Sequence, residues 1–264
     1  MVLNQYLIDY YTQYTEDARL TTQRGSVEFL TTMQYIERYA KSGDRIIEIG
    51  TGTGRYAHAL ARQGYNVDAV ELVQHNIDVF RQNTHPNEKV TITQGNATDL
   101  SKFKDNVYDI TLLLGPMYHL FSKEDKQAAL REAIRVTKHG GVVFAAYCIS
   151  DASILVSGFK LKKYSIEEFI EKGYIDAQTF AVHSEPSLLF EIVRKEHIDA
   201  LMADFPVTRL HYIATDGYAF HMKDEVDAMD APAFSLFMQY HFATCEREDM
   251  VGLTAHALDV FKKD

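Results

Sequence analysis

A glycine-rich loop between a short apolar run and an alanine-rich stretch constrains the fold of this chain more than any other feature. It lies in the segment IIEIGTGTGRYAHAL, residues 46–60, and contains Gly50, Gly52 and Gly54. Glycine lets the backbone turn sharply and lets a ligand approach the main chain, which a Cβ atom would prevent. The loop also opens a helix N-terminus, whose free N–H groups and dipole attract a negative group. It therefore predicts a strand–loop–helix unit that binds either a dinucleotide pyrophosphate or the carboxylate of an amino-acid moiety.

Short apolar runs alternate with amphipathic stretches along the rest of the chain. Strands are predicted at residues 45–49, 67–70, 89–93, 108–114, 142–148, 209–215 and 256–261, although the last run could equally finish a helix. Helices are predicted at residues 54–63, 74–83, 124–138, 165–172, 188–203 and 232–243. The pair Gly140-Gly141 indicates the end of the third of these helices, followed directly by a strand. Because strands that alternate with helices form parallel sheets, we expect an α/β fold: a doubly wound, Rossmann-like, seven-stranded, mostly parallel sheet with helices on both faces.

Residues 1–264 are predicted to form a single domain. Residues 1–43 form an N-terminal helical cap, in which Tyr6, Tyr10, Tyr11 and Tyr14 recur at roughly helical spacing and could close over a ligand. Residues 44–148 form the ligand-binding core, and residues 207–264 form the closing strands and a helix. Residues 149–206 form a helical insertion after strand five, at the edge where doubly wound sheets bind ligands. This insertion is either a lid that contacts the substrate or a helical decoration without functional contact.

The spacing of the loop distinguishes between the two kinds of ligand. A dinucleotide fingerprint, G-x-G-x-x-G, would need a glycine at position 55, which is Arg55. Glu48 stands two residues before the first glycine, where its charge would repel a pyrophosphate and attract the ammonium group of a methionine moiety. Glu71 ends the second predicted strand, 21 residues after Gly50, and could accept hydrogen bonds from both ribose hydroxyls. A solvated charge at a strand end is the alternative for Glu71. The pattern favours S-adenosyl-L-methionine (SAM) as the ligand.

The segment EIGTGTG resembles motif I of the class I SAM-dependent methyltransferases, and VEL resembles their acidic second-strand motif. QGNATDL (94–100), YDITLLLGPMYHL (108–120) and KHGGVVF (138–144) resemble three later motifs of that family, in its order and spacing. The chain is most similar to the ubiquinone/menaquinone-biosynthesis-like group of small-molecule methyltransferases. The resemblance spans roughly residues 40–148, so it does not identify the substrate.

This resemblance implies that SAM is the cofactor and that its methyl group passes to a nitrogen, oxygen or carbon atom of a small molecule. It also implies cofactor-binding roles for residues in all of these motifs. They are Glu48, Gly50, Thr51, Gly52 and Gly54 at the methionine end, Glu71 and Leu72 at the ribose and adenine face, Asn96 and Ala97 at the adenine, and Leu114 and Gly115 beside the reactive sulfur. Asn96 departs from the family, in which an aspartate is common; its carbonyl oxygen could still meet the adenine amino group.

Two residues that follow the fourth predicted strand are candidates for the chemistry. Methyl transfer from a sulfonium mainly requires orientation and desolvation, and a base is needed only when the nucleophile is protonated. His119 could be that base and Tyr118 could wall the site. A histidine packed in a loop without a catalytic role is an equal alternative. His211 and Tyr212, in a later strand, are further candidates.

Composition restricts the partners of the chain. It has 27 basic and 37 acidic residues, a formal charge of -10, which disfavours a nucleic-acid partner. His183, Glu185 and Glu191 have no diagnostic metal-ligand spacing, and Cys148 and Cys245 form no disulfide framework, so no metal is expected. The N-terminus lacks the features of a signal peptide, and no apolar run has the length of a membrane span. We therefore expect a cytoplasmic protein whose partner is a small-molecule acceptor; the sequence does not indicate an oligomeric state.

Three alternative functions stay open at this point. A SAM-binding homologue without catalytic activity would keep the same glycine loop and Glu71. A tRNA methyltransferase would have to bind a polyanion despite the charge of -10. An NAD(P)-dependent oxidoreductase on a related sheet conflicts with Arg55 and Glu48.

Overall fold

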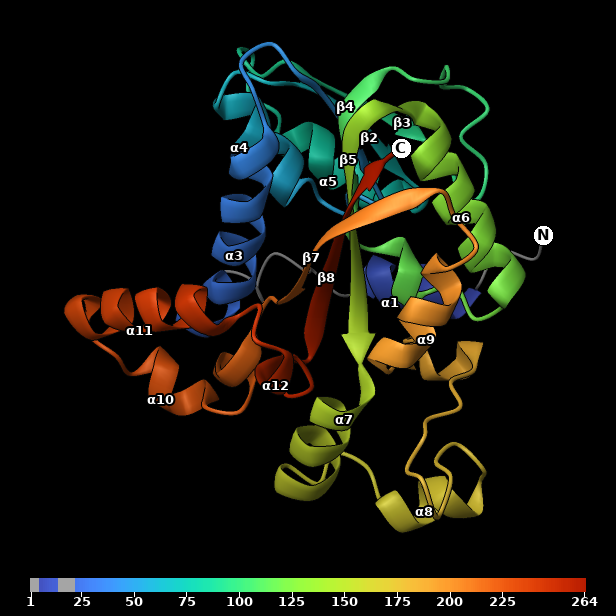
Figure 1. The fold of residues 1–264 in the computed structure, drawn as a ribbon, viewed down its shortest axis with the longest axis vertical. Helices are drawn as coiled ribbons and strands as arrows, with labels where there is room; N and C mark the ends of the chain where they lie inside the picture. The colour runs from blue at the N-terminus through green and yellow to red at the C-terminus, as the bar shows by residue number, and fades with distance from the viewer. Residues whose placement is uncertain (1–4, 14–21) are drawn as a thin grey trace.

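A twisted sheet runs through the centre of the molecule, whose computed structural model describes residues 5–13 and 22–264 (Figure 1). Within these residues the sheet has eight strands: β1 (Arg45–Ile49), β2 (Asn66–Glu71), β3 (Val90–Gln94), β4 (Tyr108–Leu113), β5 (Thr137–Ile149), β6 (Ile192–Val193), β7 (Val207–Ala214) and β8 (His256–Lys263). Their order is β3-β2-β1-β4-β5-β8-β7, and β6 pairs with the end of β5. Only β8 is antiparallel to its neighbours. The chain order reverses between β1 and β4, which is where open α/β sheets bind ligands.

Helices cover both faces of the sheet, as the alternating pattern predicts. On one face lie α3 (Gln23–Tyr39), α4 (Arg55–Arg62) and α5 (Gln74–Asn83), and on the other lie α6 (Lys123–Val136) and α9 (Lys195–Met202). Ile46 and Phe144 face the first group, whereas Ile47 and Val143 face the second, and all four side chains are fully buried. Because successive side chains of a strand alternate between faces, a strand buried on both faces is a continuous apolar run. This is why short apolar runs in the sequence predict the strands.

The remaining helices extend from the sheet or connect its strands. They are α1 (Gln5–Gln13), α7 (Ser150–Ser153), α8 (Ile166–Glu171), α10 (Lys223–Asp227), α11 (Ala231–Thr244) and α12 (Glu248–Val251), with 3₁₀ turns at Pro116–Tyr118, Pro186–Leu188 and Gly217–Phe220 and a π-helix at Ile154–Lys160.

None of the helices in the described part of the chain combines the length and the apolar character needed to traverse a bilayer.

Side-chain caps fix where the longer helices begin. The Ser122 hydroxyl accepts a hydrogen bond from the Asp125 N–H at the start of α6, and Thr22 does the same for α3. Asp230 caps α11 in the same way, one turn before Ala233. Each cap satisfies an N–H group that has no partner within its helix.

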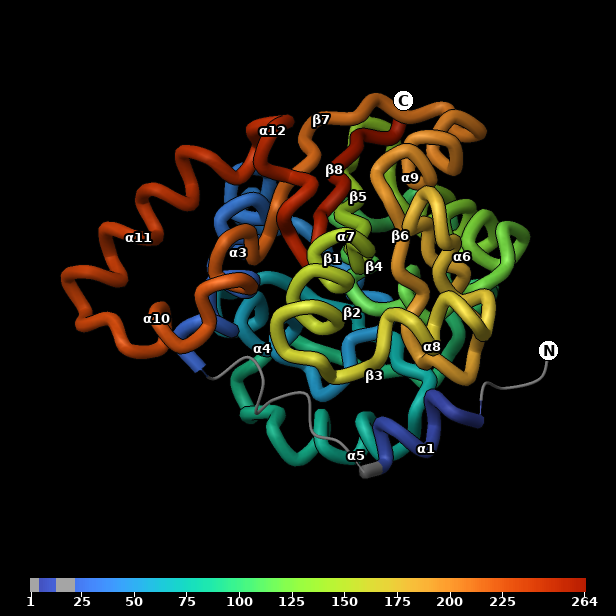
Figure 2. Tube along the Cα trace, turned by 90° about the horizontal axis from the view of Figure 1, so that it is seen from below, coloured from blue at the N-terminus to red at the C-terminus, as the bar shows by residue number. Residues whose placement is uncertain are grey.

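Within the segment 149–206, the part from α7 to α8 lies at the carboxyl ends of the strands, whereas α9 packs on one face of the sheet. Figure 2 views this edge and shows α7 and α8 in front of the sheet. Ile154, Ile166 and Ile175 form a small apolar core within the insertion. The segment predicted as an insertion thus includes one helix of the sheet layer, and the function of its remaining part is considered below.

Three details of the sequence prediction differ from the structure. The sheet has seven strands along its main path, but β6 adds an eighth, within a segment predicted to be one helix over 188–203. Only the second half of that segment is helical, as α9. The third predicted helix ends at Val136 rather than near Gly140, because Thr137 already has extended backbone angles and its buried hydroxyl bonds to the Ala133 carbonyl. The uncertain run at 256–261 is a strand, β8.

A buried ion pair joins the two strands at the end of the sheet. The Asp259 carboxylate on β8 is fully buried, and Arg209 on β7 donates to both of its oxygens at 2.7 and 2.9 Å. The third nitrogen of the guanidinium, Nη1, donates to Asp199 of α9 at 2.6 Å. The guanidinium therefore links β7, β8 and α9.

We expect Arg209→Met to lower the free energy of unfolding by about 3–5 kcal/mol, because it leaves the buried Asp259 carboxylate without its partner. Urea unfolding followed by circular dichroism would measure the change. The double variant R209M/D259L serves as the control, since it removes both charges and should recover a large part of the loss. Equal instability of the single and double variants would contradict this account.

Candidate active site

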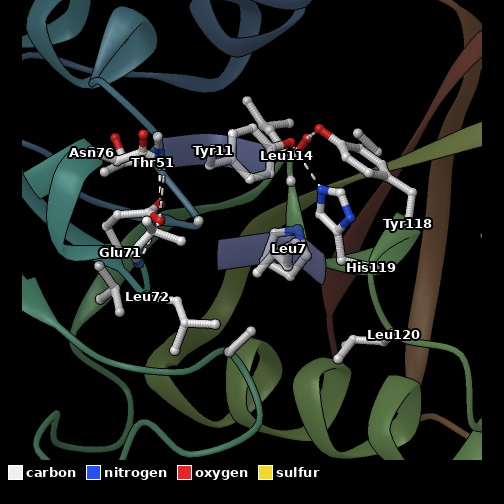
Figure 3. Close-up of a pocket in the computed structure, with 18 of the residues that line it drawn as sticks. Leu7, Tyr11, Thr51, Glu71, Leu72, Asn76, Leu114, Tyr118, His119 and Leu120 are labelled. Carbon is white, nitrogen blue, oxygen red and sulfur yellow. Dashed lines mark hydrogen bonds between the residues drawn. The ribbon is translucent and has the colours of Figure 1, made fainter. Parts of the chain in front are cut away.

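A cavity of about 1120 Å³ opens at the carboxyl ends of β1, β2 and β4. Its walls come from α1, α3, the loops after β1, β2, β3 and β4, and the start of β8. Figure 3 shows Thr51, Glu71 and Asn76 at one end, Tyr118 and His119 at the other, and Leu7 between them. Single-ligand sites usually enclose about 300–1,000 Å³. This cavity is therefore large enough for a nucleoside-sized molecule and a second, smaller one.

The glycine loop turns sharply into α4 at one end of the cavity. Gly50 has φ +73°, and a Cβ atom there would lie 2.6 Å from the Pro116 Cδ atom of the loop after β4. Gly54 has φ +95° and packs against the Phe80 and His58 side chains. A Cβ atom on Gly52 would meet nothing within 4 Å. The packing of neighbouring loops thus requires glycine at positions 50 and 54, whereas Gly52 leaves open space beside the cavity.

Glu48 lies beneath this loop and is buried. One of its oxygens accepts hydrogen bonds from the Thr51 hydroxyl at 2.7 Å and from the Ala57 N–H at 2.9 Å. Burial raises the pKa of the Glu48 carboxyl to about 7, although these two hydrogen bonds oppose the shift. Glu48 also lines the cavity. A cation placed beside it would restore the charged form.

Glu71 connects the two loops that follow β1 and β2. One oxygen accepts from the Gly52 N–H at 2.9 Å, and the other accepts from the Val73 N–H at 2.9 Å and from the Asn76 amide at 3.3 Å. Burial raises the pKa of Glu71, and the hydrogen bonds from Val73 and Gly52 counteract part of that rise. A carboxylate has about four lone-pair sites. Glu71 can therefore accept a further hydrogen bond from a ligand in the cavity.

Most of the residues expected at the cofactor lie along this one cavity. Its walls include Glu48, Gly50, Thr51, Gly52, Glu71, Leu72, Asn96, Ala97, Leu114 and Gly115. Gly54 is the exception, because it turns toward α5. Asn76 and Arg55 also line the cavity and were not expected there. The Nε atom of Arg55 is buried without a partner among the described residues, and its guanidinium lies over the Phe29 ring.

His119 lies at the other end of the cavity with both ring nitrogens hydrogen-bonded. Nδ1 donates to the Leu189 carbonyl at 3.0 Å, so Nε2 is the acceptor for the Tyr11 hydroxyl at 2.9 Å. Burial lowers the pKa of His119 to about 4, while the hydrogen bond to Leu189 slightly opposes this shift. A neutral ring with two partners is better suited to hold α1 and the insertion together than to accept a proton. Tyr118 donates to the Leu114 carbonyl at 2.9 Å and walls the cavity.

The tyrosines of the N-terminal segment take different positions. Tyr6 and Tyr11 line the cavity, whereas Tyr10 packs edge-on against Phe190. Tyr14 lies outside the described residues. Periodicity alone could not distinguish these positions.

The other candidates from the sequence are not in the cavity. His211 bonds to Tyr39 and Glu246 on the outer side of β7, and Tyr212 is its neighbour in that strand. Glu191 forms an ion pair with Lys126, and Glu185 bonds to Tyr174 and Ser187. His211, Glu185 and Glu191 thus have partners within the protein, whereas the buried Tyr212 hydroxyl has no hydrogen-bond partner among the described residues.

One group of side chains in the cavity was missed entirely. Atoms of Glu28, Asp216 and His256 that could bind a metal lie within 4.8 Å of one another, and this is the one such group among the described residues. Glu28 and His256 line the cavity. The three positions are far apart in the sequence, so no motif could have indicated them.

Comparison with known proteins agrees with this geometry. Residues 47–145 match the family model described as a methyltransferase domain. The segment includes the glycine loop, Glu71 and the loop after β4. Residues 47–145 therefore form a domain of the class I SAM-dependent methyltransferase type. SAM is therefore its cofactor, and the resemblance stated from the sequence is confirmed.

Individual relatives are similar to this chain over the matched domain. A ribosomal protein L11 methyltransferase of Exiguobacterium sp. is 28% identical over 150 residues, which are 52% of this chain and 46% of that protein. A demethylmenaquinone methyltransferase of Clavibacter sepedonicus is 29% identical over 122 residues, 46% of this chain and 48% of that protein. The chain thus spans about half the length of the curated relatives it matches.

A solved structure from Thermotoga maritima, described as a SAM-dependent methyltransferase and possible histamine N-methyltransferase, has the same fold. Its TM-score is 0.56 at 16% identity, and the match covers 99% of this chain and 100% of that one. At this level of identity the likeness extends to the fold only. It supports a Rossmann-like arrangement for the chain beyond residue 145.

We expect Gly50→Ala to destabilise the protein by about 1–3 kcal/mol more than Gly64→Ala. Both glycines have positive φ, +73° and +96°, so both variants carry backbone strain, but only the alanine at 50 would collide with Pro116. Thermal unfolding of the two variants measures the difference. Equal losses would show that the contact between the loops after β1 and β4 is looser than the structure indicates.

Proposed function

We propose that this chain transfers the methyl group of SAM to a small-molecule acceptor bound in the same cavity. The observation that carries the proposal is the division of that cavity. Acidic and amide side chains around the glycine loop lie at one end, and a largely aromatic and apolar compartment lies at the other. The first end matches the polar groups of SAM, and the second has room for an acceptor.

The residues around the loop suit the polar groups of SAM. We infer that Glu48, with the main chain of Gly50, Thr51 and Gly52, takes the methionine end, where a neighbouring ammonium would favour the charged form of the buried Glu48 carboxyl. The buried, unpartnered Nε atom of Arg55 would receive the methionine carboxylate. Gly54 would act indirectly, by shaping the turn into α4.

The nucleoside would lie along the loops after β2 and β3. We infer that Glu71 accepts from the ribose hydroxyls, with Asn76 holding the Glu71 carboxylate in place. Leu72 would pack on the adenine, and Asn96 and Ala97 would contact its edge. Leu114 and Gly115, at the end of β4, would border the sulfur.

The acceptor compartment favours a small molecule. Tyr6 and Tyr11 of α1 and Pro186 of the insertion help to enclose it. We infer that residues 149–206 and the N-terminal cap together form a lid on a single catalytic domain. A formal charge of -10 opposes a polyanion such as tRNA, although it does not distinguish a nitrogen, oxygen or carbon acceptor.

Bound SAM would supply a methyl carbon already activated by the positive sulfur. The protein then has to orient the acceptor in line with the sulfur–carbon bond and exclude water. The apolar side chains of Leu7, Leu114 and Leu120 line the cavity and would exclude water from the reacting atoms. A homologue that binds SAM without catalysis would also have the acidic and amide side chains around the glycine loop. Transfer of a labelled methyl group from SAM to an acceptor distinguishes a methyltransferase from such a homologue.

Calorimetric titration with SAM, S-adenosylhomocysteine and NADH tests the cofactor assignment. We expect the first two to bind and NADH not to bind. Glu71→Ala should weaken SAM binding by roughly 1–3 kcal/mol, because buried polar partners are left unmet. Glu37→Ala, on the outer surface of α3, is the control. Tight NADH binding, or unchanged SAM affinity in E71A, would contradict the assignment.

Binding of SAM should release protons near neutral pH. Free Glu48 has a pKa of about 7, so at pH 7 about half of it is protonated. A cation beside the carboxylate lowers this pKa, and we expect roughly 0.5 proton to be released per SAM, with affinity rising as the pH increases through 7. Titrations in buffers of different ionisation enthalpy measure the release. Glu48→Gln should abolish it, and equal release by E48Q and the wild type would place the ammonium elsewhere.

A further inference from the structure

His256 and Asp216 form a hydrogen-bonded pair at the edge of the cavity. His256 begins β8, and Asp216 follows the end of β7, which is the neighbouring strand. The Nδ1 atom of His256 lies 2.8 Å from one carboxylate oxygen of Asp216. None of the catalytic roles expected from the sequence involves this pair.

Asp216 is held firmly in its position. Its other oxygen accepts hydrogen bonds from the Thr254 hydroxyl and from the N–H groups of Ala255 and His256. Burial alone would raise the pKa of Asp216, but the charge of His256 and these hydrogen bonds hold it below the usual value. An ionised carboxylate only accepts hydrogen bonds, so Nδ1 of His256 carries the hydrogen. When the ring is neutral, Nε2 is then its basic nitrogen, and the side-chain hydrogen bond of His256 to the described residues runs through Nδ1.

His256 lines the same cavity. β8 is two strands away from β4 in the sheet, a separation of roughly 10 Å. Since the sulfur of SAM is proposed to lie at the end of β4, a small acceptor fits between it and His256. Thr32 and Glu28 of α3, together with Ala146 of β5, line the cavity beside the ring.

Charged and titratable groups surround His256 from every neighbouring element. Glu28 of α3 lies 3.6 Å from Nδ1, Asp216 lies in the loop after β7, and Cys148 is opposite on β5. Burial lowers the pKa of His256, but Glu28, Cys148 and Asp216 together raise it well above the usual value. The neutral ring therefore binds a proton more tightly than an ordinary histidine does, in contrast to His119, whose pKa falls to about 4, and it can act as a base only at pH values above its own pKa.

We propose that His256, oriented by Asp216, is the residue that accepts the proton of the methyl acceptor. This inference rests on the proposed function. The acceptor heteroatom forms a bond to the methyl carbon, the carbon–sulfur bond breaks, and its electron pair stays on sulfur to give S-adenosylhomocysteine. The proton of the acceptor passes to Nε2, and the resulting imidazolium is stabilised by Asp216 and Glu28. Asp216 is a positioning residue, since it acts through the ring, as an aspartate does in hydrolase triads.

This role restricts the class of acceptor. A proton acceptor is useful only where the nucleophile carries a hydrogen, as in a phenol or other hydroxyl, or an N–H group. A thioether or tertiary amine has no proton to give and would gain nothing from His256. The acceptor is therefore an O–H or N–H compound small enough to fit beside Tyr6 and Tyr11.

An NMR titration of the histidine ring carbons tests the pair in the whole protein. The His256 signal, assigned by its loss in His256→Asn, should titrate with a midpoint above 6.5. Asp216→Asn should lower this midpoint by about 1–2 units, because it removes the facing charge. A midpoint at or below 6.5, or one that is the same in D216N, would overturn the proposal. The titration needs no acceptor and no SAM, so it stands apart from the test of the proposed function.

Methyl transfer from labelled SAM to phenol, benzylamine and imidazole gives the second readout. H256N should keep its SAM affinity within about twofold and lose about 10²–10⁴-fold in transfer rate. Because only the neutral ring can accept a proton, kcat/KM should rise as the pH passes the pKa of His256. In D216N this rise should occur at lower pH, in step with the lowered NMR midpoint. His139→Asn, an exposed position at the opposite edge of the sheet, is the matched control and should leave the rate unchanged. Full activity in H256N would overturn the proposal. A second result would also overturn it: loss of transfer on adding a chelator and recovery on adding a divalent cation. Glu28, Asp216 and His256 would then be metal ligands.

Discussion

The hydrogen bond from the Gly52 N–H to the buried Glu71 carboxylate is the interaction on which the shape of the cavity depends. It joins the loop after β1 to the end of β2. The other oxygen of Glu71 binds Val73 and Asn76 at the start of α5, so one side chain fixes three segments. A buried charge is unfavourable unless it is hydrogen-bonded, and three donors reduce that cost. In the proposed complex the ribose hydroxyls would add further donors, so the interaction that shapes the cavity would also recognise the nucleoside.

The part of the fold around this interaction could be predicted from local sequence patterns. Strands buried on both faces are continuous apolar runs, and β1 and β4 lie almost where those runs do. The motif residues follow the strands at fixed spacing, so they meet at one edge of the sheet. Gly54 is instructive, because the glycine pattern places it correctly but cannot tell that it packs against Phe80 instead of facing the cavity.

The rest of the site depends on contacts between distant segments, which local patterns do not encode. His119 looks like a base in the sequence, yet its environment is set by Tyr11 and by the Leu189 carbonyl, 70 residues away. The strand β6 forms because the insertion returns beside β5, and two residues cannot carry a periodic signal. Asp216 and His256 are brought together by the antiparallel pairing of β7 and β8. Their joint role becomes visible only in three dimensions.

The distribution of charge in the cavity is suited to a reaction that consumes a positive charge. The carboxylates of Glu48 and Glu71 gather at the glycine loop, where in the proposed complex they meet the ammonium and ribose, groups that do not change during transfer. The sulfur, which loses its charge, would instead lie beside Leu114 and the apolar wall near Leu120. A carboxylate close to the sulfur would stabilise SAM more than the transition state and so slow the reaction. In the proposed complex the buried charge of Glu48 and Glu71 would therefore hold the constant groups, an apolar wall would face the sulfur, and the charged groups around His256 would lie on the far side of the acceptor, away from the sulfur.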